Sequence, residues 1–195
     1  MDGKLIVWLR PLARGSTKGE LDGQLRRVAV PGEFVLSHVF MDEYQVPLDG
    51  VPRGLYVKDA TYGGASVLHE PMRVGSALGG TLRIIMGRDG GTVGVKVADK
   101  DGNPVADIDV YVLPANAPSE ALVPAVTVRS QTDPSGSYTS GVLAPGKYYV
   151  LASRVRVDAT PESAGKLWRS RSRGKEVALG PNGSLQATVE PVAIE

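Results

Sequence analysis

The chain holds few side chains of the kinds that catalyse reactions or bind transition metals. It has no cysteine, and its two histidines are His38 and His69, the second followed by Glu70. Both histidines fall in or beside predicted strands, whereas zinc normally takes three or four converging ligands. A covalent nucleophile needs a base within hydrogen-bond reach, and the second half of the chain has no histidine. We therefore expect no catalytic residues, no metal site and no cofactor, and hence no enzyme activity.

The segment "DKDGN", Asp99–Asn103, has features of the start of a calcium-binding loop. It places oxygen ligands at alternate positions and a glycine where such a loop turns. The glutamate that closes a calcium loop at its twelfth position is missing, because that position, counted from Asp99, is Val110. We therefore interpret the segment as a hairpin turn, with calcium binding as the weaker alternative.

The one local concentration of charge is "KLWRSRSRGK", Lys166 to Lys175. On an extended strand, Arg169, Arg171 and Arg173 would share one face, because side chains alternate along a strand. Arginine forks suit carboxylates, phosphates and sulfates, and Trp168 could stack on a sugar ring. Two interpretations stay open: a surface that binds a glycan or polyanion, and a charged edge strand that prevents aggregation.

Short runs of alternating apolar residues recur along the chain. "TLRIIM", "TVGVKV" and "SLQATV" each place apolar side chains on one face, which is typical of half-buried strands. Between such runs lie "DKDGNP", "DPSG", "APG" and "GPNG", which have turn chemistry. Helical periodicity is weak, apart from a short helical turn near "TPESAGKLW" that Thr160 caps. With 42 % hydrophobic residues available for a core, the sequence predicts an all-β fold of many short strands, as in β-sandwiches.

The chain contains an internal repeat. "GEFVLSHVFMDEYQV", residues 32–46, matches "GSYTSGVLAPGKYYV", residues 136–150, at an offset of 104, and "GTLRIIM" matches "GSLQATV" at an offset of 103. "IVWLRP" likewise resembles "VYVLP". A repeat of about a hundred residues is the size of one small sandwich domain. We interpret residues 136–150 as a hairpin closed by a Pro-Gly turn. The residues expected to be mostly buried are Phe34, Tyr44, Val93, Val95, Val97, Tyr138, Tyr148 and Val150.

The repeat predicts two domains, 1–89 and 90–195, joined near "GRDGG", residues 87–91. The two copies differ at their starts. The second has "GGTVGVKVADKDGNPVADID" before its first matching strand, whereas the first has only "MDGKL". The first domain is therefore expected to lack an opening strand, which would leave an unpaired sheet edge able to pair with a neighbour.

"GGTVGVKVADKDGNPVADIDVYVLP", followed by "TDPSGSYTSGVLAPGKYYVLA", resembles the carboxypeptidase regulatory-like domain family. The shared pattern is G-x-V-x-G-x-V-x-D-x-x-G-x-P-V, then a strand ending in proline, then D-x-x-G-x-[FY] and P-G-x-Y. Gly94 stands one position early, and Ser140 replaces an apolar residue. The resemblance implies two tandem Ig-like or transthyretin-like β-sandwich domains, no catalysis, and an extracellular or cell-envelope setting within a larger exported bacterial protein. The implied partners are neighbouring domains of that chain or a cell-surface protein or glycan.

Composition excludes several other classes. The formal net charge is +1, so no global field favours nucleic acid or an anionic membrane. The chain has no run of about 18 apolar residues, the length needed to span a bilayer. Its start, "MDGKLIVWLRP", lacks the features of a signal peptide. An intramolecular isopeptide bond is disfavoured, because Asn103, Asn116 and Asn182 all lie in predicted turns. We expect a non-catalytic structural or interaction module, with a carbohydrate- or polyanion-binding module as the alternative.

Overall fold

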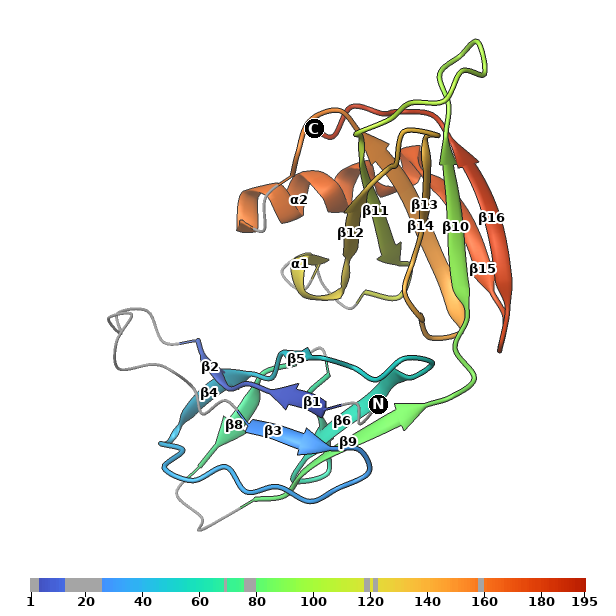
Figure 1. Cartoon of the computed structure of the whole chain (residues 1–195). Helices are drawn as coiled ribbons and strands as arrows, with labels where there is room; N and C mark the ends of the chain where they lie inside the picture. The colour runs from blue at the N-terminus through green and yellow to red at the C-terminus, as the bar shows by residue number, and fades with distance from the viewer. Residues whose placement is uncertain are drawn as a thin grey trace. The chain divides into compact units, whose positions relative to one another are not determined.

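Strands make up most of the regular structure in this computed structural model, which describes residues 4–12, 26–68, 70–75, 80–117, 120, 123–157 and 160–195 (Figure 1). The fold is all-β and is built from Ig-like β-sandwiches, which confirms the fold class predicted from the alternating runs. The chain divides into two compact units, Met1–Arg88 (unit 1) and Asp89–Glu195 (unit 2), and each sheet consists of strands from one unit.

Unit 1 contains two short sheets that continue each other and a third that packs on them. The sheet orders are β3-β1-β5, β2-β4-β8 and β7-β6-β9. The Trp8 amide donates to the Pro47 carbonyl oxygen at 3.1 Å, across the gaps between β1 and β2 and between β4 and β5. Leu82 and Ile84 of β9 pack against both core clusters of the unit. The strands are β1 (Lys4–Val7), β2 (Arg10–Pro11), β3 (Arg26–Ala29), β4 (Asp42–Gln45), β5 (Leu48–Asp49), β6 (Tyr56–Tyr62), β7 (Ala65–Ser66), β8 (Met72–Val74) and β9 (Leu82–Gly87).

Unit 2 is a sandwich of a three-stranded sheet, β13-β10-β16, and a four-stranded sheet, β12-β11-β14-β15. The pairing of β10 with β16 is parallel, and the other strand pairs of the unit are antiparallel. Its elements are β10 (Thr92–Val97), β11 (Asp109–Pro114), α1 (Val123–Val126), β12 (Val128–Gln131), β13 (Ser137–Thr139), β14 (Gly146–Ser153), α2 (Pro161–Ser170), a 3-10 turn (Arg171–Arg173), β15 (Lys175–Leu179) and β16 (Ser184–Val189).

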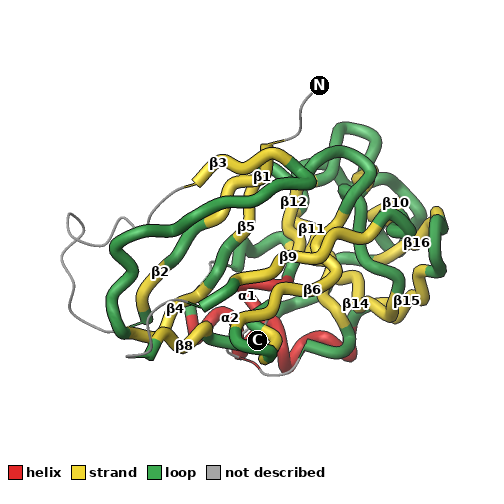
Figure 2. Tube along the Cα trace, turned by 90° about the horizontal axis from the view of Figure 1, so that it is seen from below, coloured by secondary structure: helices red, strands yellow, loops and turns green. Residues whose placement is uncertain are grey.

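Strand β11 is buried on both faces, which explains its unbroken apolar sequence "VYVL". Val110 and Val112 lie in the core between the two sheets. Tyr111 and Leu113 belong instead to a second cluster that includes Ala164 of α2. Unit 2 therefore has three layers, because the short helices α1 and α2, red in Figure 2, cover the outer face of the four-stranded sheet.

Helix α2 begins where the sequence predicts a helical start. Thr160 is its N-cap, and Thr160 Oγ1 accepts a hydrogen bond from the Ser163 amide at 3.2 Å. Pro161 occupies the first turn, where its missing amide proton costs nothing. The helix is longer than the single turn expected, since it continues to Ser170.

Each unit contains a tyrosine whose hydroxyl holds the chain that leads into its own strand. Tyr44 Oη donates to the Phe40 carbonyl oxygen at 3.1 Å. Tyr148 Oη donates to the Ala144 carbonyl oxygen at 2.7 Å. This contact is the tyrosine corner of β-sandwich folds. It occurs at matching positions of the two repeat copies, four residues before the tyrosine in each case.

The strand neighbours of the two tyrosines match as well. Tyr44 pairs with Pro11 of β2, and Tyr148 pairs with Pro114 of β11. On the other side, β4 pairs with β8 and β14 pairs with β15. The repeat in the sequence is therefore a repeat of three adjacent strands and of the corner that begins the central one.

Residues 136–150 are not the hairpin that the Pro-Gly turn suggested. Strand β13 pairs with β10 in one sheet, whereas β14 pairs with β11 and β15 in the other. The connection between β13 and β14 thus crosses from sheet to sheet, and the Tyr148 corner fixes its end. The prediction was wrong because turn residues show that the chain changes direction but do not determine which strands become neighbours.

Most of the expected core is buried, but two aromatic residues are only half-buried. Phe34 packs at the margin of a unit 1 cluster, and Tyr138 packs at the margin of the unit 2 core. Tyr138 lies on β13, which is an edge strand of its sheet. The buried members of the expected set are Tyr44, Val93, Val95, Val97, Tyr148 and Val150.

In unit 1, β6 takes the place beside the last strand that the opening strand β10 has in unit 2. Strand β6 pairs with β9 in antiparallel orientation, from Tyr56 opposite Gly87 to Tyr62 opposite Leu82. It occupies the centre of its sheet, as β10 does in unit 2. The partner of β9 is therefore supplied by the connection between β5 and β8 and not by an opening strand, a substitution that the sequence comparison of the two copies did not reveal.

Candidate functional site

The basic segment 166–175 is mostly helical, so the extended strand considered for it is wrong. Ala164, Leu167 and Ser170 recur at every third residue and are buried against the sheet, which is the spacing of one helix face. A 3-10 turn then covers Arg171–Arg173. The alternation of arginine and serine therefore does not mark a strand, and it does not align the three arginines on one face.

Trp168 and Arg171 contact each other within this segment. The Arg171 guanidinium lies 4.0 Å from the centroid of the Trp168 ring, a cation–π contact, and its Nη1 donates to the Trp168 carbonyl oxygen. Trp168 is half-buried and packs against the cluster beneath α2. Arg169 has a more distant partner, with its Nη1 at 3.9 Å from Oε1 of Glu120. One face of the Trp168 ring is therefore covered by an arginine of the same unit.

Arg173 holds the last residues of the chain against α2. Its Nη1 donates to the Ala193 carbonyl oxygen at 3.1 Å, and its Nη2 lies 3.2 Å from Glu195 Oε2. The Glu195 amide donates to Ser170 Oγ at 3.1 Å. Through these contacts the basic segment holds residues 193–195 on the outer layer of unit 2.

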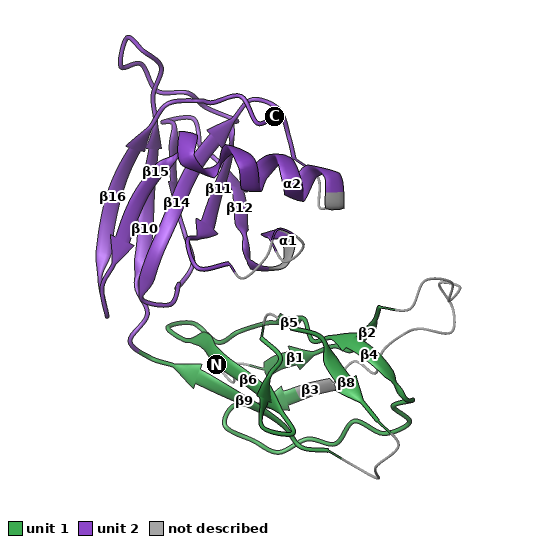
Figure 3. Ribbon diagram, turned by 180° about the vertical axis from the view of Figure 1, so that it is seen from behind, with its two compact units in different colours: residues 1–88 green, residues 89–195 purple. Residues whose placement is uncertain are grey.

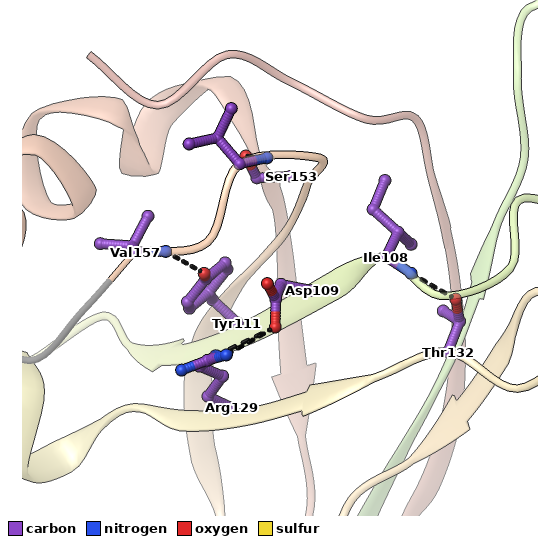
Figure 4. A network of polar contacts seen from close by, with 8 residues as sticks. Ile108, Asp109, Tyr111, Arg129, Thr132, Ser153 and Val157 are labelled. Atoms are coloured by element: carbon purple, nitrogen blue, oxygen red, sulfur yellow. Dashed lines mark hydrogen bonds and ion pairs between the residues drawn. The ribbon is translucent and has the colours of Figure 1, made fainter.

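A buried polar network, which the sequence pattern did not reveal, lies between β11, β12 and the chain that follows β14 (Figure 4). Asp109 is 5 % exposed, and its Oδ1 lies 3.0 Å from both Nε and Nη2 of Arg129. Tyr111 Oη accepts from the Val157 amide at 2.8 Å. Burial is the main cause that raises the pKa of the Tyr111 hydroxyl. The one available signal was an acidic residue opening the apolar run "DVYVL".

Two buried hydroxyl groups, each on the residue that follows a strand, form hydrogen bonds with backbone groups of neighbouring segments. Thr132 Oγ1 accepts from the Ile108 amide at 3.2 Å and donates to the Val105 carbonyl oxygen at 2.9 Å. Ser140 Oγ accepts from the Val93 amide at 2.9 Å. Ser140, which stands where the family pattern has an apolar residue, therefore has a definite role in holding β10.

The Asp99 carboxylate is used by its own turn. Asp99 Oδ1 accepts from the Asp101 amide at 2.9 Å and from the Asn103 amide at 2.8 Å, and Oδ2 accepts from Asn103 Nδ2 at 3.2 Å. The hydrogen bond from the Asn103 amide is the largest cause that lowers the pKa of Asp99. This is the geometry of the hairpin turn that we expected. Throughout the described ranges, no group of three or more His, Asp or Glu side chains could hold a metal ion.

The turn at Asp133 repeats this device. Asp133 Oδ1 accepts from the Ser135 and Ser137 amides, each at 2.9 Å, and from the Ser135 hydroxyl at 2.7 Å. The hydrogen bond from the Ser135 side chain is the largest cause that lowers the pKa of Asp133. Both aspartates accept hydrogen bonds from amides two and four residues ahead, so their charge stabilises a turn.

Neither histidine adds to the groups described so far. His38 is exposed in the loop between β3 and β4 of unit 1. His69 lies outside the described residues. No helix in the described part of the chain is long and apolar enough to cross a membrane.

Comparison with known proteins gives structural neighbours only. No family model matches the chain, and no curated protein matches it in sequence. Among solved structures, a streptococcal ancillary pilin is 16 % identical over 97 % of this chain and 62 % of its own length, with a TM-score of 0.37. The pilus 2b backbone protein of group B streptococcus is 14 % identical over 97 % of this chain and 78 % of its own, with a TM-score of 0.37.

BcpA, the major pilin subunit of Bacillus cereus, is 9 % identical over 96 % of this chain, with a TM-score of 0.33. The chain spans 62 % of the length of the ancillary pilin and 59 % of that of BcpA. These identities and TM-scores carry no argument about function.

Proposed function

We propose that the chain is a non-catalytic structural module of a larger exported surface protein. Its partners are then neighbouring domains of that protein or other cell-surface molecules. The observation that carries the proposal is the repeated scaffold: the same corner, with the same strand neighbours, is built once around Tyr44 and once around Tyr148. A chain that builds the same corner with the same strand neighbours twice is organised as repeated scaffold.

The use of polar side chains supports the same proposal. Asp99 and Asp133 stabilise turns, Asp109 holds Arg129, and Arg173 holds the last residues of the chain. Catalysis needs an acid, base or nucleophile directed at a substrate. The polar groups described above are directed instead at the protein's own backbone or at one another.

We further propose that unit 2 is a carboxypeptidase regulatory-like domain with a transthyretin-like strand order, within boundaries of 90–195. The supporting features are the turn motifs quoted above and the order of its strands, fourth-first-seventh in one sheet and third-second-fifth-sixth in the other. Residues 1–89 form a related sandwich in which β6 replaces an opening strand. The exported setting follows from the resemblance to this family.

The test is an activity screen on the purified chain. It covers peptide, ester and glycoside substrates, with a known hydrolase of each kind as a positive control. The proposal predicts no turnover above the buffer rate with any substrate. Turnover that copurifies with the chain, and that is lost on urea unfolding and recovered on refolding, would contradict it.

A further inference from the structure

The first and last strands of unit 2 are hydrogen-bonded neighbours and run in parallel (Figures 1 and 3). The register joins Thr92 to Ser184 at one end and Val97 to Val189 at the other. At the two limits of this ladder, the Thr92 amide donates to the Gly183 carbonyl oxygen at 2.9 Å and the Ala98 amide donates to the Val189 carbonyl oxygen at 3.1 Å. The backbone bonding therefore covers the whole length of both strands.

This arrangement sets the direction in which tension acts. The chain enters β10 at Thr92 and leaves β16 at Val189, which are opposite ends of the same ladder. Tension applied along the chain therefore pulls the two strands past each other, parallel to their axes. The evenly spaced, slanted hydrogen bonds of a parallel pair join the strands along their whole length, so such a pull strains all of them together. A pull on two strand ends at the same side breaks them one after another.

Strand β10 is also held against sliding by its other contacts. Val93, Val95 and Val97 are at most 1 % exposed in the sandwich core. Its second edge pairs with β13, and the Ser140 amide donates to the Val93 carbonyl oxygen at 2.9 Å. Moving β10 along its axis would therefore withdraw three interlocked side chains from the core at once.

We propose that unit 2 is a tension-resisting module and that the β10–β16 ladder is its mechanical clamp. This inference rests on the proposed function, because tension reaches the clamp only when the chain on both sides of unit 2 is held by other parts of a structure. The clamp is non-covalent. Lys96 is exposed and pairs with Thr188 of β16, so no asparagine or aspartate stands opposite it for an isopeptide bond.

Unit 1 lacks this arrangement in its described residues. Its first described strand, β1, pairs with β3 and β5, whereas its last strand, β9, belongs to the other sheet and pairs with β6. No described ladder joins the strand through which the chain enters to the strand through which it leaves. We therefore expect unit 1 to unfold at a lower force than unit 2.

The test compares two directions of pulling on the same folded unit. Because the chain has no cysteine, handles can be attached at introduced ones. Arg88→Cys with Glu190→Cys places the handles at opposite ends of the ladder, which shears it. Arg88→Cys with Ser184→Cys places them at the same end, which unzips it. All three side chains are exposed. If the Ser184 variant does not fold, Pro181→Cys is exposed at the same end and replaces it.

The clamp predicts an unfolding force several-fold higher in the shearing variant, at the same loading rate. Thermal unfolding of both variants without load is the control and should give equal midpoints. Equal forces in the two directions, or a lower force on shearing, would overturn the clamp. Such a result would not contradict the proposed structural function. Turnover in the activity screen would contradict the structural function, but it would not change the ratio of the two unfolding forces.

Discussion

At the scale of single residues, the side chains that first suggested chemistry are used to hold the fold. Asp99, which begins the calcium-like segment, accepts three hydrogen bonds from its own turn. Arg173, from the basic segment, binds the last residues of the chain. The residue types could be read from the sequence, but their partners could not, because Ala193 and Glu195 come to Arg173 only through the packing of a distant segment.

The Tyr148 corner gives the first prediction. Tyr148→Phe removes the 2.7 Å bond to Ala144 and should destabilise unit 2 by about 1 kcal/mol, the usual net value of one hydrogen bond. Tyr148→Ala should cost about 3–5 kcal/mol, because it also empties a core position. The measurement is urea unfolding followed by the fluorescence of Trp168 in a Trp8→Phe background, which leaves one tryptophan, in unit 2.

Tyr44→Phe, in the same background, is the matched control, since it removes the equivalent bond from unit 1 and should leave the Trp168 transition unchanged. A Tyr148→Ala variant within about 0.5 kcal/mol of the parent would mean that the Tyr148 ring contributes little to the core.

The second prediction concerns the pH dependence of the two aspartate turns. The pKa values of Asp99 and Asp133 are both lowered from the ordinary 3.8 by hydrogen bonds to the charged form. Their contribution to stability is therefore complete above the unfolded-state value and is lost as pH falls through the folded-state values. Unit 2 should lose stability below about pH 4.

The variant Asp99→Asn with Asp133→Asn keeps an oxygen acceptor in each turn but removes the titration. Its urea midpoint, measured in steps from pH 5 to pH 2 in the Trp8→Phe background, should fall less steeply than that of the parent. The same slope in both proteins would show that other groups cause the acid sensitivity.

The third prediction concerns the buried ion pair. Arg129→Ala leaves the Asp109 carboxylate buried without its partner, and removal of one member of such a pair typically costs about 3 kcal/mol. Because the Arg129 side chain is 28 % exposed, water can partly replace it, and we expect about 2 kcal/mol. Asp109→Ala with Arg129→Ala should cost less than the sum of the single variants. Additive costs would mean that the two side chains contribute independently.

At the scale of elements, the helical start was predictable and the helical extent was not. The Thr160 cap is a local signal, and it lies where the sequence indicates. The stretch after it alternates arginine and serine, which has the period of a strand. Burial decided the outcome, because Ala164, Leu167 and Ser170 are buried at helical spacing.

The fourth prediction follows from this helix. Because the arginines of α2 and the 3-10 turn have partners within unit 2 and do not share a face, the variant with alanine at Arg169, Arg171 and Arg173 should be retained on heparin and glycan resins as weakly as the parent. The variant should also lose stability, which circular dichroism during heating would detect. Strong retention of the parent alone would establish a binding surface on this segment.

At the scale of the whole chain, the repeat predicted two sandwiches but not every connection within them. Strands of the repeat could be matched because apolar alternation and the tyrosine corner are local patterns. Strand β6 could not be foreseen as the partner of β9, because it comes from a connection that in unit 2 forms α2. The crossing between β13 and β14 was missed for a similar reason: sheet membership depends on contacts far apart in sequence.

The measurement that tests the account most directly is stretching of the single chain from handles at its two ends. If the chain is a scaffold of two units that bears tension, each molecule should show two separate unfolding events, one for each unit. The weaker event should release the shorter length, that of unit 1, and the stronger event the longer length, that of unit 2, because only unit 2 has a ladder between its entering and leaving strands among the described residues. A single event, or a first event that releases the longer length, would contradict the account.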